Sequence, residues 1–279
     1  MSITDKISSL ESFAEVTAKF NSNHNKQFRE LILNFLVSNK YARKDLNKLS
    51  KLHDFIEDKS LMGIENQVVD GKVSYGLTGL SKTFYSLVDD EKFKSIYINM
   101  LLYLYEIFGI DFYFQNFPTI RAHFPNEASK QSYPLFHVDG ATGHPPSEIN
   151  LWMPITNNKE NTFTIMSYRD SLSILEEMNF NYEELNDKAY NDREFNQLCL
   201  DKSTGVDGDD SSLYVFNSLR LHSTLPAKNE TRISLDTRVV PAENFDFDTQ
   251  YKGGGRMGAE FWPGGRHGYN KHSISHYFK

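Results

Sequence analysis

The chain has 279 residues, 39% of them hydrophobic and 14% aromatic, which is enough to bury one sizeable core and too much for a disordered protein. Its formal net charge of −7 gives no general electrostatic reason to bind nucleic acid or an anionic membrane surface. The single cysteine, Cys199, excludes an internal disulfide and fits a reducing compartment. We therefore expect a cytoplasmic protein without a secretory signal or a membrane span.

The first 110 residues have the apolar spacing of amphipathic helices. In NKQFRELILNFLV, apolar side chains recur at i, i+3, i+4, i+7 and i+8 and form one stripe: Phe28, Leu31, Ile32, Phe35 and Leu36. A second stripe runs from Asp90 to Phe108, and Gly109 after it tolerates the left-handed conformation that ends helices. We therefore expect residues 1–110 to form a helical layer that packs against a sheet.

From Asp111 the sequence changes to short β-rich runs that are separated by glycine, proline and asparagine. This pattern is typical of a β-sandwich or barrel, here expected over residues 111–245. An acidic, partly helical insertion at 167–210 interrupts the runs and is expected to lie outside the barrel. Because no linker or repeat divides the sequence, we predict a single domain over 1–279.

The C-terminal tail, 246–279, contains the glycine-rich run YKGGGRMGAEFWPGGRHGY, which lacks the spacing of a phosphate-binding loop. Two interpretations stay open for this tail. It is either a flexible surface segment or a lid over a pocket, with these residues facing a substrate: Arg256, Trp262, Arg266 and His267.

Three residues can form a metal site. His137 and Asp139 are two positions apart in a predicted strand, so their side chains share one face about 6–7 Å apart along the backbone. His222, in a later predicted strand, is the natural third ligand. Two imidazoles and one carboxylate on one face of an octahedron leave three positions open, as in the facial triad of non-haem iron(II) oxygenases.

The run that contains His222 continues with Arg232-Ile-Ser234. Arginine is suited to a bidentate grip on a carboxylate, and a cosubstrate that chelates iron through a keto acid needs a cation at its far carboxylate. Arg232 and Ser234 share one strand face, so both can meet that carboxylate, and Thr224 shares the face of His222 and can add a hydroxyl.

Residues from Thr119 to Pro241 resemble the phytanoyl-CoA dioxygenase superfamily, in particular its branch of small bacterial oxygenases related to a streptomycin-biosynthesis protein. The resemblance rests on two segments, FHVDGATGHPPSEINLWMPIT and GDDSSLYVFNSLRLHSTLPAKNETRISLDTR. It implies a mainly β fold with α-helices, a double-stranded β-helix (a jelly-roll or cupin-like barrel) with helices packed on one face.

The resemblance also implies a cofactor set. It places iron(II) at His137, Asp139 and His222, which are also the catalytic residues, and 2-oxoglutarate, with O2 as the second cosubstrate, at Thr224, Arg232 and Ser234. Trp152 matches an aromatic residue that flanks the iron. Two looser matches are Arg121, a pocket ligand or a structural ion pair, and Asn150, a pocket contact or a hydrogen bonder that fixes its strand.

The implied activity is hydroxylation, or another oxidation, of an unactivated C–H bond in a small polar metabolite, with release of succinate and CO2. Asp139 argues against halogenation, because related halogenases carry a small residue there. If Arg121, Arg256 and Arg266 face the pocket, the substrate is anionic, and it is either free or carrier-bound. Nothing in the sequence indicates the oligomeric state.

Two other functions are compatible with part of this pattern. A cupin-like metal enzyme, an isomerase or lyase that uses no 2-oxoglutarate, explains the triad and leaves Arg232 and Ser234 without a role. A non-catalytic binding barrel explains neither the triad nor the Arg232–Ser234 pair. His144 and His123 are expected to have structural roles, His144 by ordering the turn after Asp139.

Overall fold

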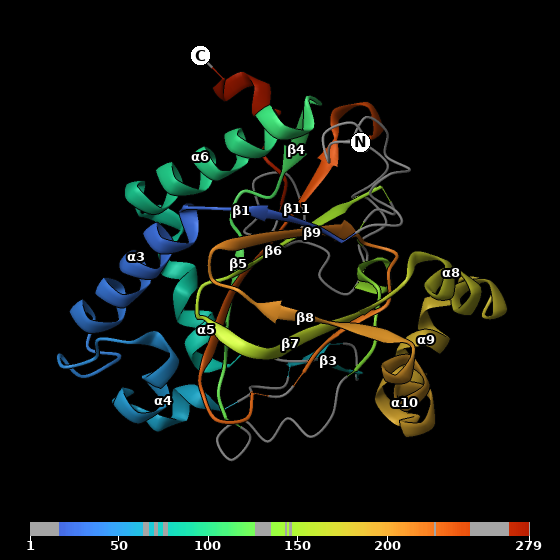
Figure 1. Ribbon diagram of the computed structural model, residues 1–279, viewed down its shortest axis with the longest axis horizontal. Coiled ribbons are helices and arrows are strands. Elements are labelled where there is room, and N and C mark those ends of the chain that lie inside the picture. Colours follow the sequence, from blue (N-terminus) through green and yellow to red (C-terminus); the bar gives the residue numbers. More distant parts are fainter. Residues whose placement is uncertain are drawn as a thin grey trace.

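The computed structural model describes residues 17–63, 67–69, 72–74, 78–125, 135–142, 144, 147–225, 227–245 and 268–278. Over these residues the chain is a mixed α and β structure whose sheets are antiparallel (Figure 1). Among them, no helix combines the length and the apolar character that crossing a membrane requires.

The larger sheet has six strands, and its longest strand carries much of the pocket described below. Its strands, in spatial order, are β1 (Ala18–Asn21), β9 (Ser212–Asn217), β6 (Ile149–Pro154), β11 (Arg232–Pro241) and β4 (Phe112–Phe114), with β5 (Thr119–His123) also paired to β11. The register places Arg121 opposite Ser234 and Asn150 opposite Arg238. Side chains from three strands therefore meet on one face.

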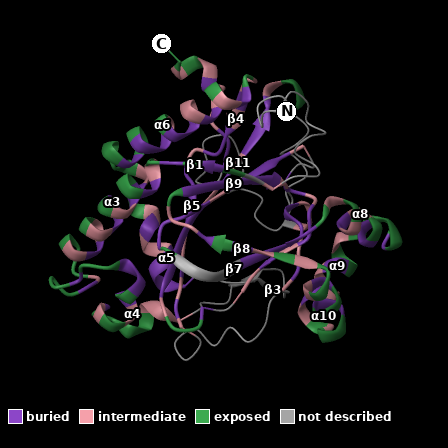
Figure 2. Cartoon of the chain, in the orientation of Figure 1, coloured by how far each residue is buried: buried purple, intermediate pink, exposed green. Residues whose placement is uncertain are grey.

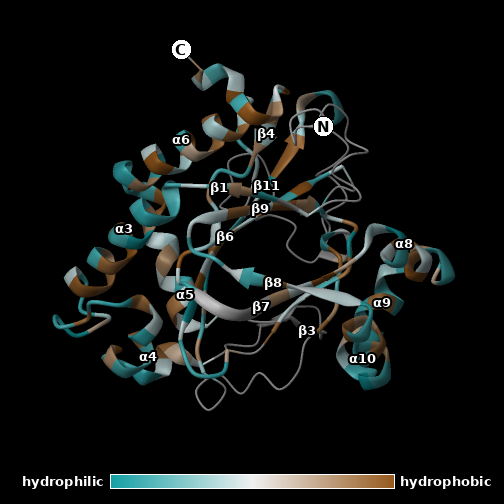
Figure 3. Cartoon of the chain, in the orientation of Figure 1, coloured by the Kyte–Doolittle hydropathy of each residue, from teal (hydrophilic) through white to brown (hydrophobic). Residues whose placement is uncertain are grey.

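A smaller sheet has three strands, β10 (His222–Thr224), β7 (Asn158–Met166) and β8 (Ser203–Gly208), in that order. A separate hairpin joins β2 (Gln67–Val69) to β3 (Lys72–Ser74). Figure 1 shows β7 and β8 lying apart from the larger sheet. The central strands of the larger sheet are largely buried, whereas β8 is largely hydrophilic and partly exposed (Figures 2 and 3).

Two long helices cover the larger sheet, α3 (His24–Ser38) and α6 (Glu91–Phe108). Both predicted stripes are confirmed as helices: four of the five stripe residues of α3 are buried, and Phe35 packs against the core from its edge. The Asp90 side chain accepts a 2.8 Å hydrogen bond from the Phe93 N–H at the start of α6. Gly109 ends the helix with a left-handed φ of 66°.

Several other elements are short. They are the helices α4 (Leu52–Phe55) and α5 (Gly79–Thr83) and the 3-10 turns η1 (Leu49–Lys51), η2 (Lys59–Met62), η3 (Phe84–Asp89), η4 (Asp139–Thr142), η5 (Ala242–Asn244) and η7 (Ile274–Tyr277).

Alternation along β6 separates the core from the pocket. Ile149, Leu151 and Met153 are buried in the main hydrophobic cluster with residues of α3 and α6. Trp152 belongs instead to an aromatic cluster on the other side of the sheet. Period-two alternation is what a strand with two covered faces requires.

The structure differs from the sequence prediction in three places. The predicted helical layer, 1–110, also contains β1, which pairs with β9, and the β2–β3 hairpin. The predicted insertion, 167–210, is helical only in α8 (Tyr168–Glu177), α9 (Tyr182–Asn191) and α10 (Arg193–Asp201). Its last part forms β8, which pairs with β7 inside the smaller sheet.

The third difference concerns the segment that carries the first two candidate ligands, which is not a continuous strand. His137 forms only an isolated antiparallel bridge with His222, and Asp139 begins η4. The sequence missed this turn because valine between the two polar residues favours a strand locally.

Candidate metal centre

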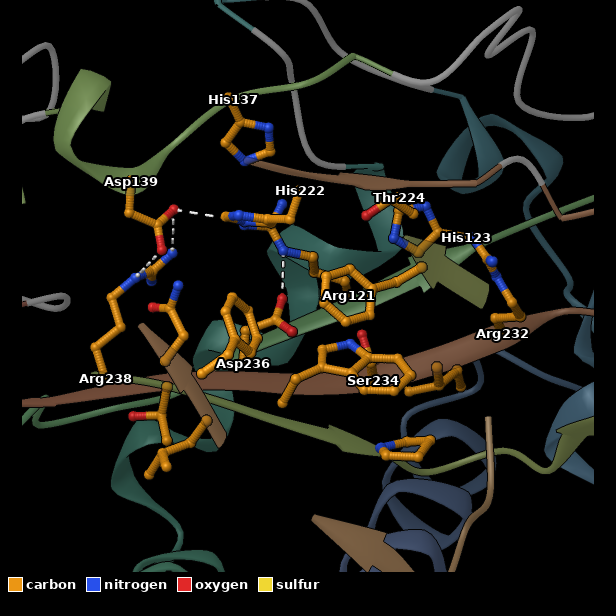
Figure 4. Close-up of a pocket in the computed structure, with 18 of the residues that line it drawn as sticks. Arg121, His123, His137, Asp139, His222, Thr224, Arg232, Ser234, Asp236 and Arg238 are labelled. Carbon is orange, nitrogen blue, oxygen red and sulfur yellow. Dashed lines mark hydrogen bonds and ion pairs between the residues drawn. The ribbon is translucent and has the colours of Figure 1, made fainter. Parts of the chain in front are cut away.

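The side chains of His137, Asp139 and His222 converge at one end of a pocket (Figure 4). Each offers one ligand atom, and these atoms lie within 4.8 Å of one another. His222 Nε2 is 3.9 Å from Asp139 Oδ1, and the two imidazole centroids are 4.5 Å apart. Over the described part of the chain, no other three His, Cys, Asp or Glu residues form such a group.

Backbone hydrogen bonds bring the three residues together. The His137 N–H donates to the His222 carbonyl over 3.1 Å, and the His222 N–H donates back over 3.0 Å. The Asp139 N–H donates to the Ser218 carbonyl over 3.2 Å. The bridge fixes His137 and His222 against each other although neither segment is a long strand there.

The two histidine rings are oriented through their Nδ1 atoms. Nδ1 of His137 is 3.1 Å from the Leu135 carbonyl oxygen, and Nδ1 of His222 is 2.9 Å from the Arg220 carbonyl oxygen. Because a carbonyl oxygen only accepts, Nδ1 carries the proton in each neutral ring. Each Nε2 then keeps its lone pair, which is the arrangement that metal-binding histidines use.

Burial gives these residues the protonation states that ligands need. Loss of hydration lowers the pKa of His137, and loss of hydration together with the neighbouring His137 ring lowers the pKa of His222 to about 4. Burial alone would raise the pKa of Asp139, but Arg238 and the nearby histidines hold it well below its usual range. At neutral pH the set is therefore two neutral imidazoles and one carboxylate.

Arg238 contacts the candidate carboxylate ligand, and sequence reasoning missed it. Its Nε is 3.3 Å from Asp139 Oδ2 and its second terminal nitrogen is 3.4 Å from Asp139 Oδ1. The same Nε lies 3.1 Å from Oε1 of the fully buried Glu148. Arg238 therefore lies between two carboxylates, and each compensates part of its buried charge.

Glu148 continues this buried network away from the pocket. Its Oε2 lies 2.8 Å from His144 Nδ1 and accepts a 2.5 Å hydrogen bond from the Tyr269 hydroxyl. His144 therefore lies against Glu148 after the η4 turn, and its N–H is 3.4 Å from the Asp139 carbonyl oxygen at the start of that turn.

The pocket-facing side of β11 is polar at every second position, and the sequence shows the same alternation in RISLDTR. The four residues are Arg232, Ser234, Asp236 and Arg238. Ile233 and Leu235 between them point into the main core. This alternation was the signal that would have identified Asp236 and Arg238 from the sequence.

The predicted carboxylate-binding residues line the same pocket as the triad. Arg232, Ser234 and Thr224 are all at its wall, and Figure 4 shows Arg232 and Thr224 at the end away from Asp139. The Arg232 guanidinium also donates a hydrogen bond to the Leu225 carbonyl oxygen. His123 lies opposite Arg232 in the strand register and lines the pocket as well.

Arg121 forms an ion pair inside this pocket. Its Nε is 2.5 Å from Asp236 Oδ2, and its side chain is 38% exposed. Burial raises the pKa of Asp236, an effect that the positive charge of Arg121 opposes. The structural ion pair, one of the two interpretations of Arg121, is therefore present, and the residue lines the pocket too.

Asn150 and Trp152 also line the pocket. Asn150 is buried, and neither atom of its amide has a hydrogen-bond partner among the described residues. Trp152 packs against Phe163 and Tyr214 with ring centroids 5.3 and 5.4 Å away. Phe163 and Phe216 also lie edge-to-face with the His222 ring, with centroids 6.0 and 5.2 Å away, so an aromatic wall lies beside this ligand.

Four residues that were predicted to face a substrate, Arg256, Trp262, Arg266 and His267, lie outside the described residues.

No protein-family model matches the sequence, and no curated protein matches it. Several solved structures are similar in shape. One is an N-substituted L-amino acid dioxygenase from Burkholderia ambifaria, 12% identical, with a TM-score of 0.43 over 86% of this chain and 88% of that one. Another is EctD from S. alaskensis with bound iron, 10% identical, with a TM-score of 0.42 over 88% and 78%.

A third similar structure is the non-haem alpha-ketoglutarate-dependent carbocyclase SnoK from nogalamycin biosynthesis. It is 9% identical, with a TM-score of 0.42 over 87% of this chain and 85% of that one. At these identities and TM-scores, the likeness assigns neither a family nor an activity to the chain.

Proposed function

We propose that the protein is an iron(II)- and 2-oxoglutarate-dependent oxygenase that hydroxylates an unactivated C–H bond of a small polar metabolite. The observation that carries this proposal is the combination, in one pocket, of the His137–Asp139–His222 group with Arg232 and Ser234. We also propose that the two antiparallel sheets are the halves of a double-stranded β-helix.

The donor set fits iron(II). Two neutral imidazole nitrogens and one carboxylate suit non-haem iron(II), and they leave coordination positions open for a cosubstrate and O2. His137, Asp139 and His222 would hold the metal. Bound iron(II) would supply the oxidising chemistry: O2 and 2-oxoglutarate are consumed, one oxygen atom enters the substrate C–H bond, and the other leaves in succinate together with CO2.

The far end of the pocket fits a dicarboxylate. The Arg232 guanidinium offers N–H donors in a planar fork, and Ser234 and Thr224 offer hydroxyl donors nearby. These three residues would hold the distal carboxylate of 2-oxoglutarate and orient its keto acid end toward the triad. A metal enzyme that uses no 2-oxoglutarate would have no need for this second group.

The other pocket residues would orient the reactants and exclude water. The aromatic wall of Trp152, Phe163 and Phe216 removes solvent from the side of His222. Asn150, buried with an unpartnered amide among the described residues, would contact the cosubstrate or the substrate. Because Arg121 is already paired with Asp236, it attracts an anionic substrate less than an unpaired arginine would.

Calorimetric titration of the Mn(II)-loaded protein with 2-oxoglutarate tests the proposal against the alternative metal enzyme. We expect binding by the wild type and a loss of about 10- to 100-fold in affinity for Arg232→Ala, because the charge-assisted hydrogen bonds to one carboxylate are removed. Arg43→Ala, at an exposed arginine paired with Asp45, is the matched control. Normal 2-oxoglutarate affinity in Arg232→Ala would remove the role assigned to Arg232.

A further inference from the structure

The three helices α8, α9 and α10, here called the helical insertion, pack directly against the segments that carry the candidate ligands. Phe136 and Val138, which alternate with His137 and Asp139, are fully buried in a second hydrophobic cluster with side chains of all three helices. Leu221, the residue before His222, is buried in the same cluster. Figure 1 shows the helical insertion together at one end of β7 and β8.

Two buried polar side chains of the helical insertion accept hydrogen bonds from these segments. Asn196 Oδ1, in α10, accepts from the Phe136 N–H over 3.0 Å. Ser171 Oγ, in α8, accepts from the Leu221 N–H over 2.9 Å. Each donor is the amide directly before one of the two candidate histidine ligands, so both histidine segments are held in the same way.

Each acceptor is fixed by hydrogen bonds of its own. The Asn196 amide nitrogen donates to the Ala189 and Asp192 carbonyls over 2.8 and 2.9 Å. The Ser171 hydroxyl donates to the Ser167 carbonyl over 2.8 Å. Because these donors are engaged within the helical insertion, the acceptor oxygens are directed at the histidine segments, and a buried polar group so satisfied resists reorientation.

The middle helix, α9, contacts the η4 turn that begins at Asp139. A Cβ atom at Gly140, next to Asp139, would lie 3.0 Å from the Tyr182 hydroxyl, so the Tyr182 side chain of α9 packs tightly against this turn and would have to shift to admit a larger residue. Asn186, also in α9, donates from Nδ2 to the Ala141 carbonyl over 3.3 Å. All three helices therefore contact backbone that carries or adjoins a candidate ligand.

We propose that the helical insertion is the positioning unit of the metal centre and that Ser171 and Asn196 are positioning residues for His222 and His137. This inference rests on the proposed metal at the triad. His137 and His222 are joined by a single isolated bridge rather than by a long strand. The hydrogen bonds from the Phe136 and Leu221 amides to Asn196 and Ser171 therefore limit how far the two histidine rings can move. Residues that orient metal ligands in this way contribute to metal affinity.

The test is Mn(II) affinity, measured by calorimetry on the full chain without 2-oxoglutarate, beside thermal stability of the metal-free protein. For Ser171→Ala, which removes one oxygen, and for Asn196→Ala, we expect the dissociation constant for Mn(II) to rise about 10-fold. For Asn186→Ala, which removes the longer 3.3 Å hydrogen bond from a half-buried side chain, we expect a smaller rise in the Mn(II) dissociation constant.

Ser81→Ala is the matched control, because Ser81 is a buried helix serine whose hydroxyl accepts from the Ala122 N–H over 2.8 Å, away from the three candidate ligands. Ser81→Ala and Ser171→Ala should lower the melting temperature by similar amounts, because each removes a buried hydroxyl acceptor, but Ser81→Ala should leave Mn(II) affinity unchanged. Equal Mn(II) affinity in Ser171→Ala, Asn196→Ala and the control would overturn the inference. A wild type that binds no Mn(II) would instead overturn the metal site itself, and the inference with it.

Discussion

At the residue scale, Arg238 keeps Asp139 ionised, but its positive charge would compete with a bound metal ion for the same carboxylate. Arg238 contacts both oxygens of Asp139, yet it is also 3.1 Å from Glu148. Because Asp139 and Glu148 share the one guanidinium of Arg238, its positive charge neutralises neither carboxylate completely. Glu148 thus leaves part of the Asp139 charge available to a divalent cation.

Glu148→Gln should therefore weaken metal binding although Glu148 does not belong to the triad. Without the Glu148 charge, Arg238 would pair more strongly with Asp139 and compete with the metal for it. The substitution also removes one negative charge from the surroundings of the metal. We expect the dissociation constant for Mn(II), measured by calorimetry, to rise about 3- to 10-fold. The control Glu91→Gln, at an exposed residue paired with Lys94, should have no effect. Unchanged or tighter Mn(II) binding in Glu148→Gln would contradict this account.

Spacing and the family resemblance together predicted the triad and the arginine and serine that share its pocket, but not the residues that surround them. The structure brings His137, Asp139 and His222 together, and Arg232 with Ser234 lines the same cavity. Glu148 and Tyr269 could not be linked to Asp139 from the sequence, because their contact depends on chain segments far apart in sequence that meet only in the fold.

At the element scale, the two long helices were predictable and the segment around His137 was not. The apolar stripes of α3 and α6 repeat over several helical turns. In α6 the residues that begin and end the helix, Asp90 and Gly109, lie where the stripe predicts its ends. The segment from 135 to 140 is short, and its local β propensity was overridden by the η4 turn and by packing on the helical insertion. Likewise, β1 has only four residues and is defined by its partner β9.

The cap of α6 gives a prediction for this element. Replacing Asp90 by alanine removes the acceptor for the Phe93 N–H and a negative charge from the helix N-terminus. We expect a loss of about 1 kcal/mol in the free energy of unfolding, measured by urea denaturation. Mn(II) affinity should stay at the wild-type value, because α6 lies on the opposite face of the larger sheet from the pocket. Asp89→Ala, next to the cap, is the control and should change little.

At the scale of the whole molecule, burial of the histidines links stability to pH. The pKa of His222 falls to about 4 in the folded chain, from an ordinary value of 6.5. Between these values the unfolded chain binds more protons than the folded chain, so the free energy of unfolding rises with pH across this window. The stabilisation is complete above pH 6.5 and is lost as the pH falls toward 4.

The melting temperature of the metal-free protein should therefore drop as the pH is lowered from 6.5 to 4, and the drop should be smaller in His222→Gln. The lowered pKa of Asp139 acts in the same direction at still lower pH. Scanning calorimetry with EDTA at several pH values measures both slopes. Identical slopes for wild type and His222→Gln would show that His222 is not held neutral by burial.

The proposed function requires iron(II) at His137, Asp139 and His222 and a 2-oxoglutarate carboxylate at Arg232 in the same pocket, and one measurement tests both. Iron(II)-loaded protein is titrated with 2-oxoglutarate without oxygen while the weak visible charge-transfer band of the chelate is followed. The account predicts a saturable band in the wild type, none in His137→Ala, and a much higher 2-oxoglutarate requirement in Arg232→Ala. Iron(II) binding without any band, in a wild type that also fails to bind 2-oxoglutarate, would contradict the account and favour a metal enzyme that does not use this cosubstrate.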